Sequence, residues 1–397
     1  MKLISLIGVV VFLFLCWLLS EDKKRIPWKT IIVGILLQLI FALLILKTYV
    51  GRVIFDVANV IFMKVISFSE KGAMFLFGNL VTDTNIGAIV ACKVLPIIIF
   101  VSALSGILYF LGVIQFFINL IARVMYKTMA ISGVEAFSAA SFIFLGIEAV
   151  SFIKDYISKM TRSELFVVMS GFMATIASSV MVTYASFGAE PGHLLAASIM
   201  SAPAAVVIAK IIVPERGVPE TIGTAKIKIE VKEHNIIEAA ANGASAGLKL
   251  ALEVGAMLIA FISILEMINA IFILLGTTFD KVMGHVFLPF ACLMGVPFSE
   301  AHLVGQLLGT KTVFNEFLAY LKLKEFIAQG LLSQRSVVIS TYALCGFANF
   351  GSLGIIIAGV SSLAPQRRYE VASLGIKSII SGTFASFLTA IIANWLI

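Results

Sequence analysis

The chain has 397 residues, of which 60% are hydrophobic and only 13% are charged. A soluble domain has about 25% charged residues, so a soluble globule of this composition would leave much apolar surface in water. The composition excludes a soluble enzyme, a nucleic-acid module and a disordered chain, and it indicates an all-α polytopic membrane protein. The net charge of +7 fits basic cytoplasmic loops rather than a nucleic-acid partner.

Eight stretches with few or no charges are about as long as the ~20 residues that cross a bilayer. The predicted transmembrane helices are residues 3–20, 31–50, 94–115, 165–188, 193–213, 254–275, 336–363 and 375–397. Basic residues lie between spans one and two, before span four, after span five and between spans seven and eight. Since basic loops face the cytoplasm, we predict a multi-pass protein of the inner (plasma) membrane with both termini outside.

Four further segments do not fit simple spans. Residues 53–82 and 114–130 mix apolar runs with charges, which is typical of helices that lie in the membrane interface. Residues 131–160 and 288–330 are apolar, are interrupted by glycine and polar residues, and hold carboxylates in the middle of the run. Irregular backbone survives at membrane depth only where it is buried in protein or lines a cavity. We therefore predict two re-entrant hairpins.

The two hairpin segments and the spans that follow them share one order of landmarks. Each leads to a Glu in mid-run, Glu148 or Glu316, then to an Arg-Ser pair and then to Gly-Phe inside a span that glycine can break. The predicted topology starts the first copy on the cytoplasmic side and the second copy outside. This pattern predicts an inverted repeat, which in secondary transporters places the substrate site at mid-membrane. The alternative is a chance similarity between membrane helices rich in Gly and Ser.

The polar residues within these apolar runs are the candidate ligand contacts. A lone carboxylate at the bilayer centre costs at least ~2.5 kcal/mol, so Glu148 and Glu316 each need a partner, a cavity, a proton or a ligand. A carboxylate can hold a vicinal diol by accepting two hydrogen bonds. Asn349 and Ser352, close to Phe347, share one face if their segment is helical. The alternative for each Glu is a buried carboxylate held by helix termini.

Signs of catalysis are missing from the sequence. It shows no pair of nucleophile and base, no His or Cys cluster with metal-ligand spacing, and no phosphate-binding Gly-rich loop followed by Lys. We therefore predict that the protein is not an enzyme, that it holds no resident metal and that ATP does not drive it. No cofactor is expected beyond a co-transported cation.

Several motifs, in the same order, resemble the concentrative nucleoside transporter family. They are TRSEL at 161–165, ATIA at 174–177, MSAP at 200–203, MGVP at 294–297, NEF at 315–317 and GFANFGS at 346–352. The likeness covers nearly the whole chain. It implies a homotrimer in which a scaffold of spans one, two, three and six supports a transport unit. That unit, the two hairpins with spans four, five, seven and eight, would carry nucleoside across the membrane like an elevator.

The resemblance divides the chain into four units. Residues 1–115 would form the N-terminal scaffold with an interfacial helix, and residues 116–213 the first hairpin with spans four and five. Residues 214–275 would form a cytoplasmic linker, an interfacial helix and span six, again scaffold. Residues 276–397 would form the second hairpin with spans seven and eight.

The same resemblance implies roles for the candidate residues. Glu316, Asn349 and Ser352 would hold the ribose hydroxyls of a nucleoside. Phe347 would pack on the base, and Glu148, at the tip of the first hairpin, would lie near the base. This agrees with the chemistry of the residues, because binding sites combine an apolar lining with a few placed polar groups.

The first hairpin departs from the family pattern Gly-Gln-Thr-Glu-Ala-Pro. With Glu148 kept in register, the Gln, Thr and Pro positions fall on Gly146, Ile147 and Val150. Two polar contacts to the base are therefore missing, so base selectivity is expected to be relaxed or shifted. The preferred nucleobase is left open.

The expected cation site departs from the family as well. The Asn that helps to bind sodium in many members falls on Ser141, or on Phe142 if the gap lies elsewhere. The span-four sodium contact matches Ser179, with Val180 beside it. A site without its Asn favours weak sodium binding, and proton coupling through Glu148 or Glu316 is the alternative.

These observations predict a secondary active importer that couples nucleoside uptake to a Na+ or H+ gradient. One rival is an elevator transporter for another small polar metabolite, which the altered first-hairpin tip favours. The other rival is a channel or sensor that does not accumulate its solute.

Overall fold

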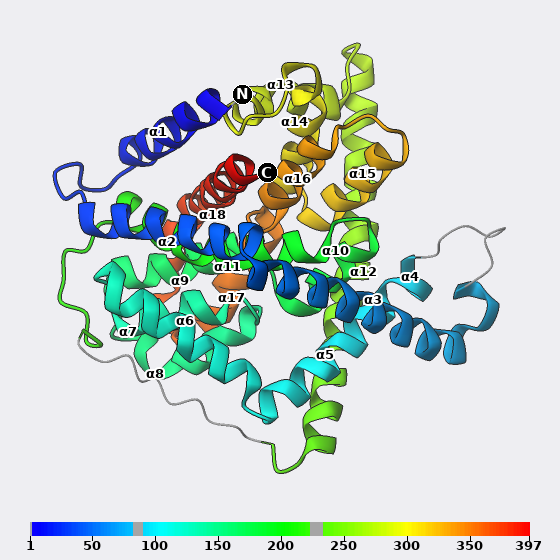
Figure 1. Cartoon of the computed structure of the whole chain (residues 1–397), viewed down its shortest axis with the longest axis horizontal. Coiled ribbons are helices and arrows are strands. Elements are labelled where there is room, and N and C mark those ends of the chain that lie inside the picture. Colours follow the sequence, from blue (N-terminus) through cyan, green and yellow to red (C-terminus); the bar gives the residue numbers. More distant parts are fainter. Residues whose placement is uncertain (1, 82–89, 223–232) are drawn as a thin grey trace.

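The computed structural model describes residues 2–81, 90–222 and 233–397, and all regular elements in these ranges are helical (Figure 1). The α-helices are α1 (Lys2–Leu18), α2 (Trp28–Lys47), α3 (Tyr49–Phe77), α4 (Val90–Lys93), α5 (Leu95–Phe110), α6 (Val113–Met129), α7 (Gly133–Ser141), α8 (Lys154–Ile157), α9 (Arg162–Ala174), α10 (Ser178–Ser186), α11 (Pro191–Ile212), α12 (Ile236–Leu274), α13 (Phe279–Leu293), α14 (Phe298–Val313), α15 (Glu316–Ala328), α16 (Gln334–Leu344), α17 (Phe350–Leu363) and α18 (Arg368–Leu396). Three 3-10 helices are η1 (Gly78–Val81), η2 (Ile147–Ile153) and η3 (Pro365–Arg367).

Within the described ranges, six helical stretches are long and apolar enough to cross a membrane, or seven if α13 and α14 form one bent span. These two helices meet at an angle of 118°. The predicted spans at 3–20 and 336–363 do not pass this test. The first is the 17-residue helix α1, and the second is divided into α16 and α17. The full count of eight spans therefore stays a prediction.

Helix α12 differs most from its predicted bounds. We predicted an interfacial helix and then a span at 254–275, but one continuous helix of 39 residues runs from Ile236 to Leu274. It begins early because the side chain of Asn235 accepts a hydrogen bond from the Glu238 amide, at 2.8 Å, which caps the first turn. Figure 1 shows α12 along one edge of the molecule, and most of its apolar window is exposed.

Helices α11 and α18 form the centre of the fold (Figure 1). Their apolar windows are 89% and 83% buried. Both α1 and α2 pack against this pair, whereas α5 packs mainly on α12. The predicted unit of residues 1–115 thus contacts two different parts of the molecule.

The same order of elements occurs twice. Helix α7 with η2 precedes the broken pair α9 and α10 and the long α11, while α14 with α15 precedes the broken pair α16 and α17 and the long α18. The helix break predicted beside Gly346 is confirmed. A Cβ at this glycine would lie 2.9 Å from the Met173 carbonyl oxygen, so the residue allows the close approach of α9.

The two breaks lie against each other. The backbone amide of Phe347, between α16 and α17, donates to the carbonyl oxygen of Thr175, between α9 and α10, at 3.2 Å. A broken helix leaves amides and carbonyls without partners in their own helix, and here one such pair is joined across the two copies. The polar residues near the breaks are therefore brought to one region of the core.

Candidate functional site

Glu316 is the first residue of α15, and only 6% of its surface is exposed. The helix begins here because Asn315 caps it, accepting a hydrogen bond from the Leu318 amide at 2.9 Å. Free amides and the positive end of the helix dipole favour a carboxylate in the first turn. The local sequence thus creates a buried position that suits an acid.

The Glu316 carboxylate accepts two hydrogen bonds from other elements. Its Oε1 accepts from the Tyr184 hydroxyl of α10, at 2.7 Å. Its Oε2 accepts from Nδ2 of Asn349, at 2.8 Å. Hydrogen bonds to an ionised acceptor are about twice as strong as neutral ones. The acid therefore joins the first copy, through Tyr184, to the second copy, through Asn349.

Asn349 and Ser352 lie at the start of α17. The Asn349 side chain is fully buried, and its Oδ1 accepts from the Ser352 amide at 2.8 Å, which caps the helix. In the described part of the chain the Ser352 hydroxyl has no hydrogen-bond partner. This hydroxyl, the remaining lone pairs of Glu316 and the second Asn349 N–H can thus contact a polyol. The structure brings these three predicted residues together.

Phe347 provides an aromatic surface beside this polar group. Its ring centroid lies 5.4 Å from that of Phe172, and the two planes are tilted by 37°. The ring is only partly buried. Two aromatic side chains from the two copies therefore form an apolar wall close to the crossing breaks.

Glu148 differs from Glu316 in its surroundings. It lies in η2 and is exposed. Among the residues that the structure describes, its carboxylate has neither a hydrogen bond nor an ion pair, so the predicted alternative of a buried acid held by helix termini is wrong here. A Cβ on Gly146, two residues before Glu148, would lie 2.9 Å from this carboxylate and 3.5 Å from the Ala177 side chain. Glu148 is thus near the break between α9 and α10.

The predicted cation ligands lie in two segments that hydrogen bonds bring together. Ser141 is the last residue of α7, and its hydroxyl donates to Phe137, at 2.7 Å. Ser179 and Val180 are in the first turn of α10. Next to them, Ser178 donates both its amide, at 3.1 Å, and its hydroxyl, at 2.8 Å, to the Phe144 carbonyl oxygen. The arrangement is compatible with a shared ligand, and the cation-binding role stays a prediction.

Two functional candidates were absent from the sequence prediction. Tyr184 gives no sequence signal, because a Tyr in an apolar helix usually serves packing. Lys311 is buried five residues before Glu316. The sequence signal that identifies Lys311 is its charge within an apolar segment, because ionisable residues in membrane segments are functional candidates.

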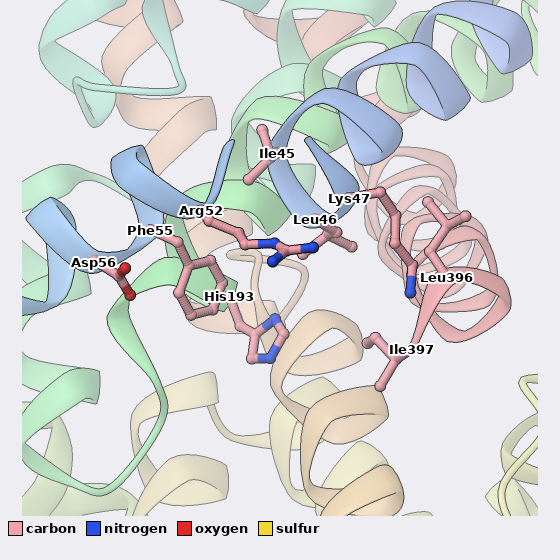
Figure 2. Close-up of a pocket in the computed structure, with 9 residues that line it drawn as sticks. All are labelled: Ile45, Leu46, Lys47, Arg52, Phe55, Asp56, His193, Leu396 and Ile397. Atoms are coloured by element: carbon pink, nitrogen blue, oxygen red, sulfur yellow. The ribbon is translucent and has the colours of Figure 1, made fainter. Parts of the chain in front are cut away.

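A cavity of about 390 Å³ lies away from this group. Figure 2 shows its nine lining side chains, which come from the end of α2, the first two turns of α3, the first turn of α11 and the C-terminal end of the chain at α18. Arg52, Lys47 and His193 are among them, but none of the predicted site residues is. The predicted polar residues are instead enclosed by protein, since Glu316 and Ser352 are each 6% exposed and Asn349 is fully buried.

Three family models match the chain and together cover most of it. "Na+ dependent nucleoside transporter C-terminus" matches residues 193–394. "Na+ dependent nucleoside transporter N-terminus" matches residues 7–80, and a gate family described as "Nucleoside recognition" matches residues 91–191. The first model alone spans just over half of the chain and contains Glu316, Asn349 and Ser352.

Curated relatives match along the whole chain. Solute carrier family 28 member 3 of Eptatretus stoutii is 40% identical over 99% of this chain and 60% of its own length. The nucleoside permease NupC of Helicobacter pylori is 38% identical over 99% of this chain and 97% of its own length. The chain thus spans about three-fifths of the animal relative and nearly all of the bacterial one.

Solved structures share the fold. The transporter CNTnw in an inward-facing substrate-bound state is 38% identical, with a TM-score of 0.94 over 99% of this chain and 98% of its own. A CNTnw variant in an outward-facing state gives the same TM-score over 100% of this chain and 98% of its own. Since both states match equally well, the likeness establishes the fold and leaves the transport state undecided.

Proposed function

The chain belongs to the concentrative nucleoside transporter family, and from this premise we propose that it is a secondary active importer of nucleosides. The observation that carries the proposal is the buried Glu316, held between Tyr184 and Asn349 at 2.7 and 2.8 Å. A transport site must be able to exchange its internal hydrogen bonds for hydrogen bonds to the solute. The Glu316 carboxylate can do so, because its two donors come from two different broken helices.

We assign the ribose to the polar group and the base to the aromatic wall. A vicinal diol would donate to Glu316 and accept from Asn349 and Ser352. Hydrogen bonds to a charged group contribute roughly 1.5–3 kcal/mol each, so a diol gripped by the carboxylate would be favoured over a deoxy sugar. The Phe347 ring would stack on the base.

We propose an elevator-type movement in the inner (plasma) membrane. The breaks of both copies are joined through Phe347 and Thr175, which supports movement of the hairpins, broken helices, α11 and α18 as one body. The exposed apolar surface of α12 must meet lipid or other copies of the chain. This surface supports the homotrimer, and the basic loops support termini on the outer side.

The coupling ion is assigned to the first copy. The family description names Na+ dependence, and Ser141, Ser179 and Val180 are the candidate ligands. Proton coupling through Glu148 or Glu316 remains the alternative, and exposed Glu148 lies near the same break. The substituted tip residues Gly146, Ile147 and Val150 favour a broadened or shifted choice of base.

Uptake into proteoliposomes tests this function. Radiolabelled uridine and adenosine would be supplied with a Na+ gradient or a pH gradient, each imposed alone. We expect accumulation above the external level with one of the two gradients, and its loss in Glu316→Gln. Equilibration without accumulation under either gradient would support a channel or a sensor, and unchanged uptake by Glu316→Gln would remove the site assignment.

One structural feature favours the rival that moves a different small metabolite. Ile147 packs toward α17, since a Cβ on Gly359 would lie 2.9 Å from it, where the family pattern has a polar residue that contacts the base. A thermal-shift screen of nucleosides, bases and carboxylates would separate the two. Stabilisation by a carboxylate and not by nucleosides would favour the rival.

A further inference from the structure

Lys311 is a buried cation that the proposed mechanism does not use. It lies in the last turn of α14, five residues before Glu316, and only 1% of its surface is exposed. A charged side chain in a membrane interior costs at least about 2.5 kcal/mol unless its surroundings compensate it. Its surroundings must therefore supply negative potential.

Oxygen atoms of neutral groups hold the Lys311 ammonium. Its Nζ donates to the Ala343 carbonyl oxygen at 2.8 Å and lies 3.4 Å from the Ser386 hydroxyl. Ala343 is in the last turn of α16, just before the break. The final carbonyls of a helix lack partners in their own helix and carry the negative end of its dipole. The ammonium thus joins α14 to the end of α16 and to α18.

A second buried lysine, Lys210, is compensated in a different way, by carboxylates rather than by neutral oxygen atoms. Lys210 forms ion pairs with Glu135 and with Glu215, the latter at 3.2 Å. In the described ranges Lys311 has no carboxylate within ion-pair distance. A buried acid, Glu316, follows five residues later as the first residue of α15. Backbone carbonyl oxygens at the end of a broken helix, such as that of Ala343, are ligands that transporters offer to Na+.

The corresponding position of the first copy holds no cation. Counting back five residues from the mid-run Glu leads to Lys311 in the second copy and to Ile143 in the first. Near Ile143 the hairpin loop is fastened by Ser178, which donates to the Phe144 carbonyl oxygen. At this position of the repeat, the first copy therefore offers an apolar side chain where the second offers an ammonium group.

We propose that the ammonium group of Lys311 is a resident cation of the second copy. It holds the second hairpin to the broken helix α16 and offsets the charge of Glu316, as a bound Na+ would. The two copies then differ in one respect: the first takes its cation from solution, and the second carries its own. The consequence for transport rests on the proposed function, but the cation site itself does not.

Thermal unfolding of the purified full chain tests the site without any transport assay. Lys311→Ala leaves a space lined by the Ala343 carbonyl and the Ser386 hydroxyl, whereas the longer side chain of Lys311→Met fills it. We expect both variants to unfold at lower temperature in choline chloride. Replacing choline with Na+ should then raise the midpoint of Lys311→Ala by several degrees more than that of the wild type or Lys311→Met. Equal Na+ responses in all three proteins would overturn the proposal.

A double substitution tests the charge balance and covers the case in which Lys311→Ala fails to fold. In Lys311→Met the buried Glu316 loses its compensating charge, so Lys311→Met with Glu316→Gln should unfold at a higher temperature than Lys311→Met alone. Additive losses would contradict the proposal. Lys324→Met, which alters an exposed lysine of α15, is the matched control and should behave as the wild type. Nucleoside uptake plays no part in either experiment, so failure here is distinguishable from failure of the transport proposal.

Discussion

The two glutamates of the repeat, Glu148 and Glu316, meet different physical requirements. Glu316 begins a 13-residue helix, is buried and accepts hydrogen bonds from two other elements. Glu148 lies in a 3-10 helix, is exposed and has no side-chain partner in the described ranges. A buried acid must be satisfied by its neighbours before a ligand arrives, while an exposed acid is satisfied by water. The comparison teaches that a repeated design can enclose its acid in one copy and leave the corresponding acid of the other copy open to solvent.

The largest expected effect comes from removing the charge of Glu316, compared with removing that of Glu148. We expect Glu316→Gln to lower the initial rate of uridine uptake at least 100-fold, because the ribose contacts and the bond from Tyr184 both weaken; two charged hydrogen bonds are worth roughly 3 kcal/mol or more. Glu148→Gln should lower it less than 10-fold. Rates measured in proteoliposomes and normalised to inserted protein would check this. Equal losses in the two variants would break the comparison.

A smaller effect is expected from the Tyr184 hydroxyl. Tyr184→Phe removes one donor to Glu316 and keeps the ring, which stacks on Tyr320 at 4.3 Å. We expect nucleoside affinity to fall roughly 5- to 30-fold, which corresponds to about 1–2 kcal/mol, with little change in the unfolding temperature. Calorimetric titration with uridine gives the affinity. An unchanged affinity would show that Tyr184 only packs.

The N-terminal caps of α15 and η2, the helices that hold Glu316 and Glu148, provide a sharper test of stability. Asn315→Ala removes the cap of α15 and should cost about 1 kcal/mol of stability. Gly146→Ala should cost less than about 0.5 kcal/mol, because the added methyl group meets the flexible carboxylate of Glu148 at 2.9 Å. Thermal unfolding in detergent measures both. A larger loss in Gly146→Ala would mean that Glu148 cannot move aside.

The smallest effect concerns an acid that pairs with one basic residue from each copy. Glu21, in the loop after α1, accepts from Arg162 of α9 at 2.9 Å and from Lys377 of α18 at 2.8 Å. The bond from Arg162 is the main cause that lowers the pKa of Glu21 to about 2, from the ordinary 4.5. Because the folded-state pKa is depressed, the stabilisation is complete well above pH 4.5 and is lost as the pH falls through about 2.

Solvent screens this partly exposed network, so we expect no more than about 1 kcal/mol from it. Glu21→Gln should therefore unfold slightly earlier than the wild type at pH 7, and the two curves should converge as the pH is lowered below 4.5. Thermal scans from neutral to acidic pH measure the difference. A gap that widened on acidification would have the wrong sign for this ion pair.

Much of the fold follows from local sequence, and the exceptions have identifiable causes. Long apolar stretches with few charges mark α2, α5, α11 and α18, because a helix that crosses a bilayer needs about 20 mostly apolar residues. Periodic apolar residues mark α6 as amphipathic, with Ile118 and Met125 buried on the face opposite its charged residues. The start of α12 was misplaced because polar residues can continue a helix beyond the apolar stretch. Its small residues Gly243 and Gly247, which allow close packing on α5, are visible only with the partner helix in place.

The site divides in the same way. Glu316, Asn349 and Ser352 were predictable because each is a polar residue in an apolar context, where its cost demands a reason. Tyr184 was not, because nothing in its own segment distinguishes a hydroxyl that meets a carboxylate from one that serves packing. Their contact joins residues 132 positions apart, and such a pairing depends on how the broken helices cross.

The amino-acid sequence by itself determined the membrane-protein class, the repeated order of helices and breaks, and the acids that need compensation, since composition, periodicity and the cost of burying charge act locally. Only the tertiary structure decided that one repeated acid is enclosed and the other open, and that Lys311 is held by carbonyl and hydroxyl oxygens. Those outcomes depend on the surroundings that distant segments create, and electrostatic cost is set by surroundings rather than by neighbours in sequence.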